Sequence, residues 1–134
     1  MVDSAAFSGV GTTFNRNGSP IAEVNSITGP NLSRGTIDVT SLDTTGGYRE
    51  FIGGFRDGGE ISLEMNFTEA SFDALKDDFE SADVQAYTIV FSDTGSTTLG
   101  FSGLVTAIGV AVPMDDKVTA NVTIKISGQV TLTT

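Results

Sequence analysis

Apolar and polar residues alternate along several stretches of this chain, and the alternation predicts β-strands. The longest stretch covers residues 117–133, and residues 60–67 alternate just as regularly. Residues 36–40 and 87–91 give shorter signals of the same kind. Because successive side chains of a strand point to opposite faces, each stretch is expected to bury one face. Gly128 interrupts the apolar face of the longest stretch, so we expect that strand to bend there.

The apolar faces of these strands give the predicted core. Ile37 and Val39 should point inward from the first strand. The two most regular strands contribute Ile61, Leu63, Met65, Phe67, Val118, Ala120, Val122, Ile124, Ile126, Val130 and Leu132.

Within residues 97–112 the alternation of apolar and polar positions changes phase. Leu99 and Phe101 share one parity, whereas the apolar positions from Leu104 to Val110 keep the other. We therefore expect a β-bulge at Gly103, where one extra residue would shift the alternation. Turn residues at 93–96 and 114–117 predict hairpins that join three consecutive strands.

One segment, residues 68–82, has helical periodicity. Phe72, Leu75 and Phe79 recur at spacings of three and four and form one apolar stripe, and Thr68 suits the N-cap position. The predicted fold class is therefore mainly β, an antiparallel β-sandwich or barrel with one α-helix. Residues 1–20 are rich in Gly, Ser, Thr and Asn and are predicted to form an N-terminal arm anchored by Phe7 and Phe14, while residues 21–134 form one domain.

The glycine-rich segment from about residue 42 to residue 59 carries large apolar side chains that a surface loop would not need. Burying a large apolar side chain contributes about 1.5–3 kcal/mol, whereas ordering each loop residue costs roughly 1–2 kcal/mol, so such a loop cannot order itself. Either it packs as a flap on its own sheet, or a neighbouring subunit covers it. Because charges alternate beside the aromatic residues, we favour assembly and assign the contact to Tyr48, Arg49, Phe51, Ile52, Phe55 and Arg56.

The composition narrows the possible functions. The 134 residues include 17 acidic and 7 basic side chains, a formal net charge of −10, and no cysteine or histidine. So acidic a chain is not expected to grip nucleic acid or an anionic membrane, and no disulfide or histidine-based chemistry is available. The chain shows no secretory signal and no apolar run long enough for a membrane span, so we expect synthesis in the cytoplasm.

Two groups of residues could carry chemistry. Asp93, Thr94 and Gly95 match the signature of aspartic proteases, although the same residues are ordinary in a hairpin turn. The predicted helix carries the carboxylates of Asp73, Asp77, Asp78 and Glu80, which could hold calcium or could simply face water. We favour the turn and the solvated helix face, and we expect no catalytic residues, cofactor or metal.

A resemblance to a known family covers roughly residues 20–130. The stretches "IAEVNSITGPNLSRGTIDVTSLDT", "GGYREFIGGFRDGGEISLEMNF", "TIVFSDTGSTTLGFSGLV" and "VPMDDKVTANVTIKISG" occur in an order that resembles the major tail tube proteins of long-tailed, non-contractile, lambda-like bacteriophages. The resemblance implies a structural virion protein of the phage tail that forms hexameric rings, which stack into a tube around a tape-measure protein. Tail-end proteins would be further partners, and the long loop would reach a neighbouring ring and be disordered before polymerisation.

The resemblance also implies that DNA passes through the lumen during ejection without specific binding. Glu60 and Glu64 are the predicted acidic lumen residues, whereas the face that carries Lys117 and Lys125 is expected outside or at subunit junctions. A different structural β-sandwich, such as a capsid decoration protein or an adhesin module, is the alternative.

Overall fold

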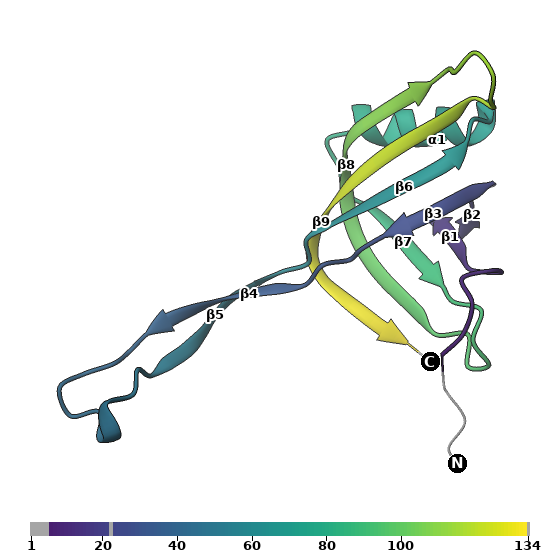
Figure 1. Ribbon diagram of the computed structural model, residues 1–134. Helices are drawn as coiled ribbons and strands as arrows, with labels where there is room; N and C mark the ends of the chain where they lie inside the picture. Colours follow the sequence, from purple (N-terminus) through teal and green to yellow (C-terminus); the bar gives the residue numbers. More distant parts are fainter. Residues whose placement is uncertain (1–5, 22, 134) are drawn as a thin grey trace.

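A curled antiparallel sheet forms the body of the molecule, with one helix beside it and a long hairpin projecting away (Figure 1). The computed structural model describes residues 6–21 and 23–133. Within these residues the body has seven strands in the order β2-β1-β7-β8-β9-β6-β3, and β4 pairs only with β5. The elements are β1 Thr13–Arg16, β2 Ser19–Pro20, β3 Val24–Thr28, β4 Ser33–Asp38, the short helix η1 Thr45–Gly47, β5 Phe51–Asp57, β6 Glu60–Asn66, α1 Glu69–Glu80, β7 Gln85–Val90, β8 Thr98–Ala111 and β9 Thr119–Thr133. The predicted class, mainly β with one helix, is confirmed.

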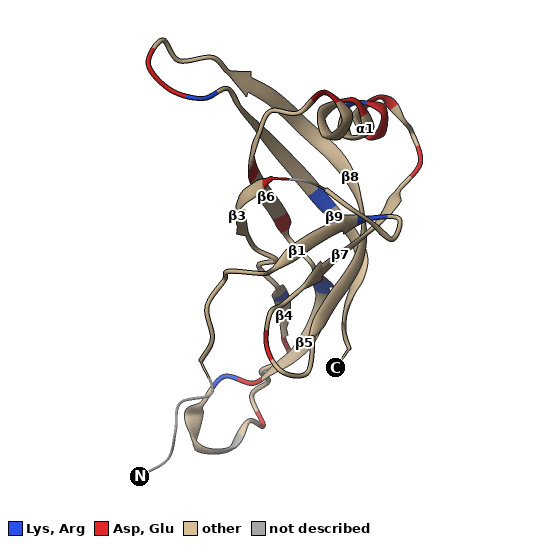
Figure 2. Ribbon diagram, turned by 90° about the vertical axis from the view of Figure 1, so that its right-hand side faces the viewer, with Lys and Arg blue, Asp and Glu red and all other residues tan. Residues whose placement is uncertain are grey.

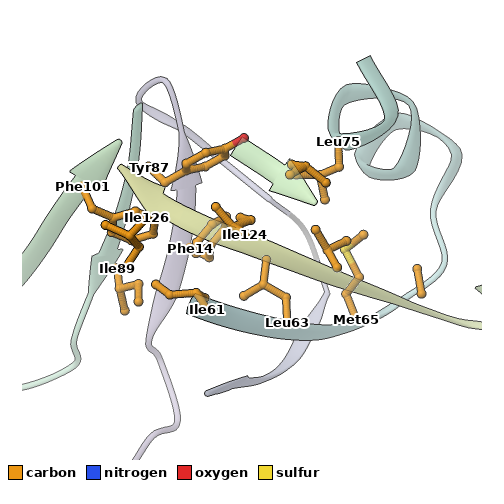
Figure 3. Close-up of a cluster of buried hydrophobic side chains, with 13 residues drawn as sticks. Phe14, Ile61, Leu63, Met65, Leu75, Tyr87, Ile89, Phe101, Ile124 and Ile126 are labelled. Atoms are coloured by element: carbon orange, nitrogen blue, oxygen red, sulfur yellow. The ribbon is translucent and has the colours of Figure 1, made fainter. Parts of the chain in front are cut away.

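The core lies inside the curl of the sheet, where side chains from several strands and from α1 meet (Figure 3). Strand β6 alternates strictly between exposed and buried residues, as its sequence predicted. It pairs with the first half of β9, in which every second residue is also buried. The buried apolar residues are Phe14, Ile61, Leu63, Met65, Leu75, Tyr87, Ile89, Phe101, Val105, Ala120, Val122, Ile124 and Ile126. The second half of β9 does not follow the prediction, because Leu132 is exposed.

Strands β7, β8 and β9 form the three consecutive hairpin-connected strands that the turns predicted. The bend at Gly128 is confirmed: this residue has a φ of +90°, and the β8–β9 register shifts across it. The predicted bulge at Gly103 is misplaced. Gly103 pairs in phase with Ile126, and a further shift comes between Val105 and Ala107. Gly103 is instead buried where a Cβ would overlap the side chain of Ile124, so its small size serves packing.

Helix α1 begins as predicted, because the Thr68 side chain accepts a hydrogen bond from the Ser71 amide. Leu75 is fully buried against the sheet. The prediction that Asp78 faces water or calcium is wrong. Asp78 is buried and accepts hydrogen bonds from Arg16 Nε at 2.6 Å and Nη2 at 2.7 Å, and from the Tyr87 hydroxyl at 2.7 Å. This carboxylate therefore ties α1 to β1 and β7.

The N-terminal arm is shorter than predicted. Residues from Thr13 onward belong to β1, which pairs with β7 in the main sheet. Phe14 is fully buried and stacks on Tyr87 with ring centroids 5.6 Å apart, so it is a core residue of the body. Phe7 is half exposed and meets Phe91 edge-on at 5.9 Å. The first five residues of the predicted arm lie outside the described residues.

Candidate assembly surfaces

Strands β4 and β5 form a hairpin arm, residues 31–59, that leaves the body and extends away from it (Figure 1). Every residue of β4 is exposed, so the prediction that Ile37 and Val39 point inward is wrong. Phe55 is 98% exposed, and Leu42 and Tyr48 are also largely open to solvent. A flap packed on its own sheet is therefore excluded for these side chains.

Polar contacts within the arm order its tip. The Val39 amide donates to the Glu50 carbonyl at 2.9 Å, and the Arg49 guanidinium donates to Asp38 at 3.1 Å. Hydrogen bonds from the side chain and amide of Thr40, and then from Arg49, lower the pKa of Asp38. The arm therefore has a defined conformation, and the expectation that this loop cannot order itself before assembly is wrong. The predicted contact residues Tyr48, Arg49, Phe51, Ile52, Phe55 and Arg56 all lie on it and are all exposed.

The arm joins the body through two close backbone crossings. Gly29 and Gly59 both have positive φ, and a Cβ on Gly59 would overlap the carbonyl oxygen of Asn31. The Gly59 amide also donates to Asp57, whose carboxylate pairs with Lys125 on β9 at 3.1 Å. These contacts, with the amide of Gly59 first, lower the pKa of Asp57. The base of the arm is thus held in place by the close backbone contact at Gly59 and by the ion pair between Asp57 and Lys125 of β9.

The predicted acidic face of β6 is exposed and carries Glu60 and Glu64, as the alternation requires. The expectation that Lys125 lies on another face is wrong. Glu60 is directly opposite Lys125 in the β6–β9 ladder, so both side chains stand on one face of the sheet. Lys117 precedes β9 and lies in the turn that follows β8. Because Lys125 is paired with Asp57, neither Glu60 nor Glu64 has an ion-pair partner in the part of the chain that the structure describes.

The possible protease motif forms a local turn. Asp93 accepts a hydrogen bond from the Thr97 amide at 2.8 Å and another from its hydroxyl at 2.6 Å. These bonds, from the side chain first, lower the pKa of Asp93. The positive φ that the turn requires falls on Ser96 and not on Gly95. Asp93 thus holds the β7–β8 turn closed.

The sequence profile of one family matches residues 7–133, and the family is described as lambda phage tail tube protein. The chain belongs to this family. Members are structural tail tube components of virions, so the chain is a structural tail tube protein, as its resemblance implied. The family is not one of enzymes. No curated protein sequence matches the chain significantly.

Solved structures of tail proteins share the tail tube fold. A chain from the virion of a native gene transfer agent particle superimposes with a TM-score of 0.79 at 23% identity, covering 96% of this chain and 100% of that one. A chain from the tail of an empty gene transfer agent particle, refined with C6 symmetry, gives 0.78 at 21% identity, with coverages of 96% and 100%. A chain from the sheath/tube terminator of an extracellular contractile injection system gives 0.77 at 14% identity, with coverages of 99% and 100%.

Sequence reasoning missed two features of this tail tube chain. One is the bond between Asp78 and Arg16, for which a faint signal existed: Asp78 lies three residues after Leu75, beside the apolar stripe. The other is a groove at the base of the arm, which no sequence pattern could indicate because its two walls are distant in the chain. Among the described residues of the tail tube chain, no helix is long and apolar enough to cross a membrane.

Proposed function

We propose that this tail tube protein assembles into hexameric rings that stack to form the tail tube of a long-tailed, non-contractile phage or a related particle. The main observation that supports this proposal is the exposed arm. It is ordered by its own hydrogen bonds, yet it leaves Phe51, Ile52 and Phe55 exposed far from the core. Apolar side chains held out in this way are typical of surfaces that another protein covers. The six-fold symmetry stated for the similar gene transfer agent tail supports a ring of six copies.

In the proposed ring, the contact surface comprises Tyr48, Arg49, Phe51, Ile52, Phe55 and Arg56 of the arm, with Phe7 of the N-terminal segment as a further candidate. Strand β3 pairs with β6 on one side only, among the strands described. Its open edge suits pairing with a neighbouring subunit, which would remove an exposed strand edge.

The lumen is proposed to be negatively charged and to let DNA pass without specific binding. Six copies with a net charge of −10 each give a ring of about −60. Glu60 and Glu64 of β6 are the proposed lumen residues. A tape-measure protein inside the tube and tail-end proteins at its ends complete the proposed assembly, which forms after synthesis in the host cytoplasm.

Electron microscopy of the purified protein over a range of concentrations tests this proposal. Hollow tubes or six-fold rings are expected at high concentration. A protein that sediments as a monomer at every concentration, with no rings or tubes on the grid, would contradict it. A capsid decoration protein or an adhesin module would give that second result.

A further inference from the structure

The base of the arm carries a groove in which two basic side chains have no ion-pair partner among the described residues. This arm-base groove has a volume of about 970 Å³ and is lined by Leu32, Arg34, Phe55, Arg56, Lys125 and Val130. Three of the seven basic residues of the chain therefore line one groove of a strongly acidic protein. Asp57 also lines the groove and is paired with Lys125, so the unpaired positive charge is that of Arg34 and Arg56. This excess of positive charge favours an acidic occupant.

Two of these cations stand directly opposite each other. Arg34 and Arg56 are paired residues of the β4–β5 ladder, so their side chains leave the same face of the arm. Like charges in this position destabilise a strand pair. Neither guanidinium has an ion-pair partner among the described residues, whereas Lys125 is paired with Asp57. The arm thus keeps a repulsive pair that an added anion would neutralise.

The walls of the groove are apolar. Leu32 and Phe55 are exposed on the arm side, while Val130 forms part of the β9 side. An occupant that packs against these walls and also pairs with the arginines combines apolar side chains with carboxylates.

The turn between β8 and β9 has this composition. We call residues 112–117 the β8–β9 tip. Met114 is 94% exposed and Val112 is also largely exposed, and Asp115 and Asp116 follow directly. No ion pair forms with either aspartate among the described residues. The tip therefore offers apolar side chains that can pack against the walls of the groove and carboxylates that can pair with its arginines.

One molecule cannot place its own tip in its own groove. Strand β9 separates them, since it begins beside the tip at Thr119 and first lines the groove at Lys125. At about 3.3 Å per residue this is roughly 20 Å of strand. Figure 2 shows the tip and the arm at opposite ends of the molecule. A contact between them is thus head-to-tail, the type that generates rings or filaments.

We propose that the β8–β9 tip of one copy of this chain docks in the arm-base groove of the next copy, with Met114 against Leu32 and Phe55, and with Asp115 and Asp116 facing Arg34 and Arg56. The inference rests on the proposed polymerisation and names the two surfaces through which neighbouring copies would contact each other.

Cysteine cross-linking tests the contact directly, because the chain has no cysteine of its own. A variant with both Leu32→Cys and Met114→Cys should give a ladder of covalent oligomers when its assembled polymer is treated with a short bismaleimide. The matched control, Asp77→Cys with Met114→Cys, places one thiol on the exposed side of α1 and should give no ladder. Tubes that form normally but yield no ladder from the first variant would overturn the inference and leave the proposed function standing. A wild-type protein that never polymerises would overturn both.

A charge exchange gives an independent test. Arg34→Glu with Arg56→Glu should raise the protein concentration needed for polymerisation at least tenfold, and Asp115→Lys with Asp116→Lys should do the same. The combination of all four changes should restore most of the loss. Asp73→Lys with Asp77→Lys, on the exposed face of α1, is the matched control and should have little effect. Combined variants that polymerise no better than either pair, while unfolding at the wild-type temperature, would contradict the proposed docking.

Discussion

A single buried carboxylate connects three elements of the body. Asp78 receives two hydrogen bonds from Arg16 and one from Tyr87, and it lies almost entirely out of solvent. Arg16 is partly exposed, so water can replace some of its lost interactions if the carboxylate is removed. Among the described residues, no buried side-chain polar atom lacks a hydrogen-bond partner. The core therefore tolerates this charge because its partners are complete.

We expect Asp78→Asn to lower the free energy of unfolding by about 2–3 kcal/mol, because the neutral amide cannot pair with the guanidinium. Chemical denaturation measures the loss. Asp77→Asn, one position earlier and exposed, is the control and should change stability by no more than about 0.5 kcal/mol. Equal effects of the two variants would show that the buried pair does not stabilise the fold.

The same cluster predicts a response to alkaline pH. Burial and then the hydrogen bond to Asp78 raise the pKa of Tyr87. The unfolded chain releases this proton near pH 10 while the folded chain retains it, so the stabilisation is complete below pH 10 and is lost as pH rises above it. The unfolding free energy should fall by up to about 1.4 kcal/mol per pH unit above pH 10.

Tyr87→Phe should remove this part of the pH dependence, measured by denaturation between pH 9 and pH 11. Tyr48, the other tyrosine of the chain, is exposed on the arm and provides the control. A Tyr87→Phe profile with the wild-type slope would count against the assignment.

At the scale of elements, the arm separates the stability of the fold from assembly. Its strands bond to each other and meet the body at their base. Side chains such as Phe55 therefore contribute little to the folding of one copy. Their cost in an isolated molecule is exposed apolar surface, which association removes.

We expect Phe55→Asp to block polymerisation while changing the thermal unfolding temperature of the monomer by no more than about 2 °C. Light scattering follows polymerisation and calorimetry follows unfolding. Phe91→Asp is the contrasting variant, because Phe91 packs partly against the core and should destabilise the fold itself. A Phe55→Asp monomer that unfolds early would show that the arm is part of the fold.

The elements also show how far a sequence can predict this fold. Strands β6 and β9 and helix α1 were predictable because one face of each is buried, and burial produces the periodic pattern. The arm has the same alternation at Ile37 and Val39, yet both residues are exposed. Alternation identifies two faces of a strand and does not state what covers either one. The chain could therefore indicate the strands of the arm but not that they leave the body.

The positions of the charged residues could be predicted only to the same extent. Glu60 and Glu64 could be assigned to one face of a strand, but the register that places Lys125 opposite Glu60 depends on pairing with a distant segment. The groove beside Arg34 and Arg56 likewise lies between segments that are distant in the chain, the β4–β5 hairpin and β9. The resemblance to tail tube proteins, by contrast, depended on the order of local motifs and needed no three-dimensional information.

At the scale of the whole molecule, the proposed acidic lumen predicts that charge governs the passage of DNA. Glu60→Lys with Glu64→Lys would change the charge of a six-membered ring from about −60 to about −36. Tubes should still assemble, and DNA ejection should slow severalfold because lysines in the lumen would bind phosphates.

Particles that carry this variant can be compared with particles that carry Asp73→Lys and Asp77→Lys, which have the same net charge but place it on α1. Time-resolved fluorescence of released DNA measures ejection. Ejection at the wild-type rate from the Glu60 and Glu64 variant would remove these residues from the lumen.

If the exposed apolar side chains of the arm form the proposed contact, assembly should depend on temperature. Burial of apolar surface near room temperature is driven by entropy and weakens on cooling. Tubes held together by Phe51, Ile52 and Phe55 should therefore loosen when chilled to about 4 °C, while each subunit keeps its own core and stays folded. Sedimentation before and after rewarming would reveal the change as a reversible return of small species, and tubes unaltered by chilling would point to polar bonds as the main cohesion. In a particle built this way, the contacts between tail subunits would be weakest in the cold, while each subunit stays folded.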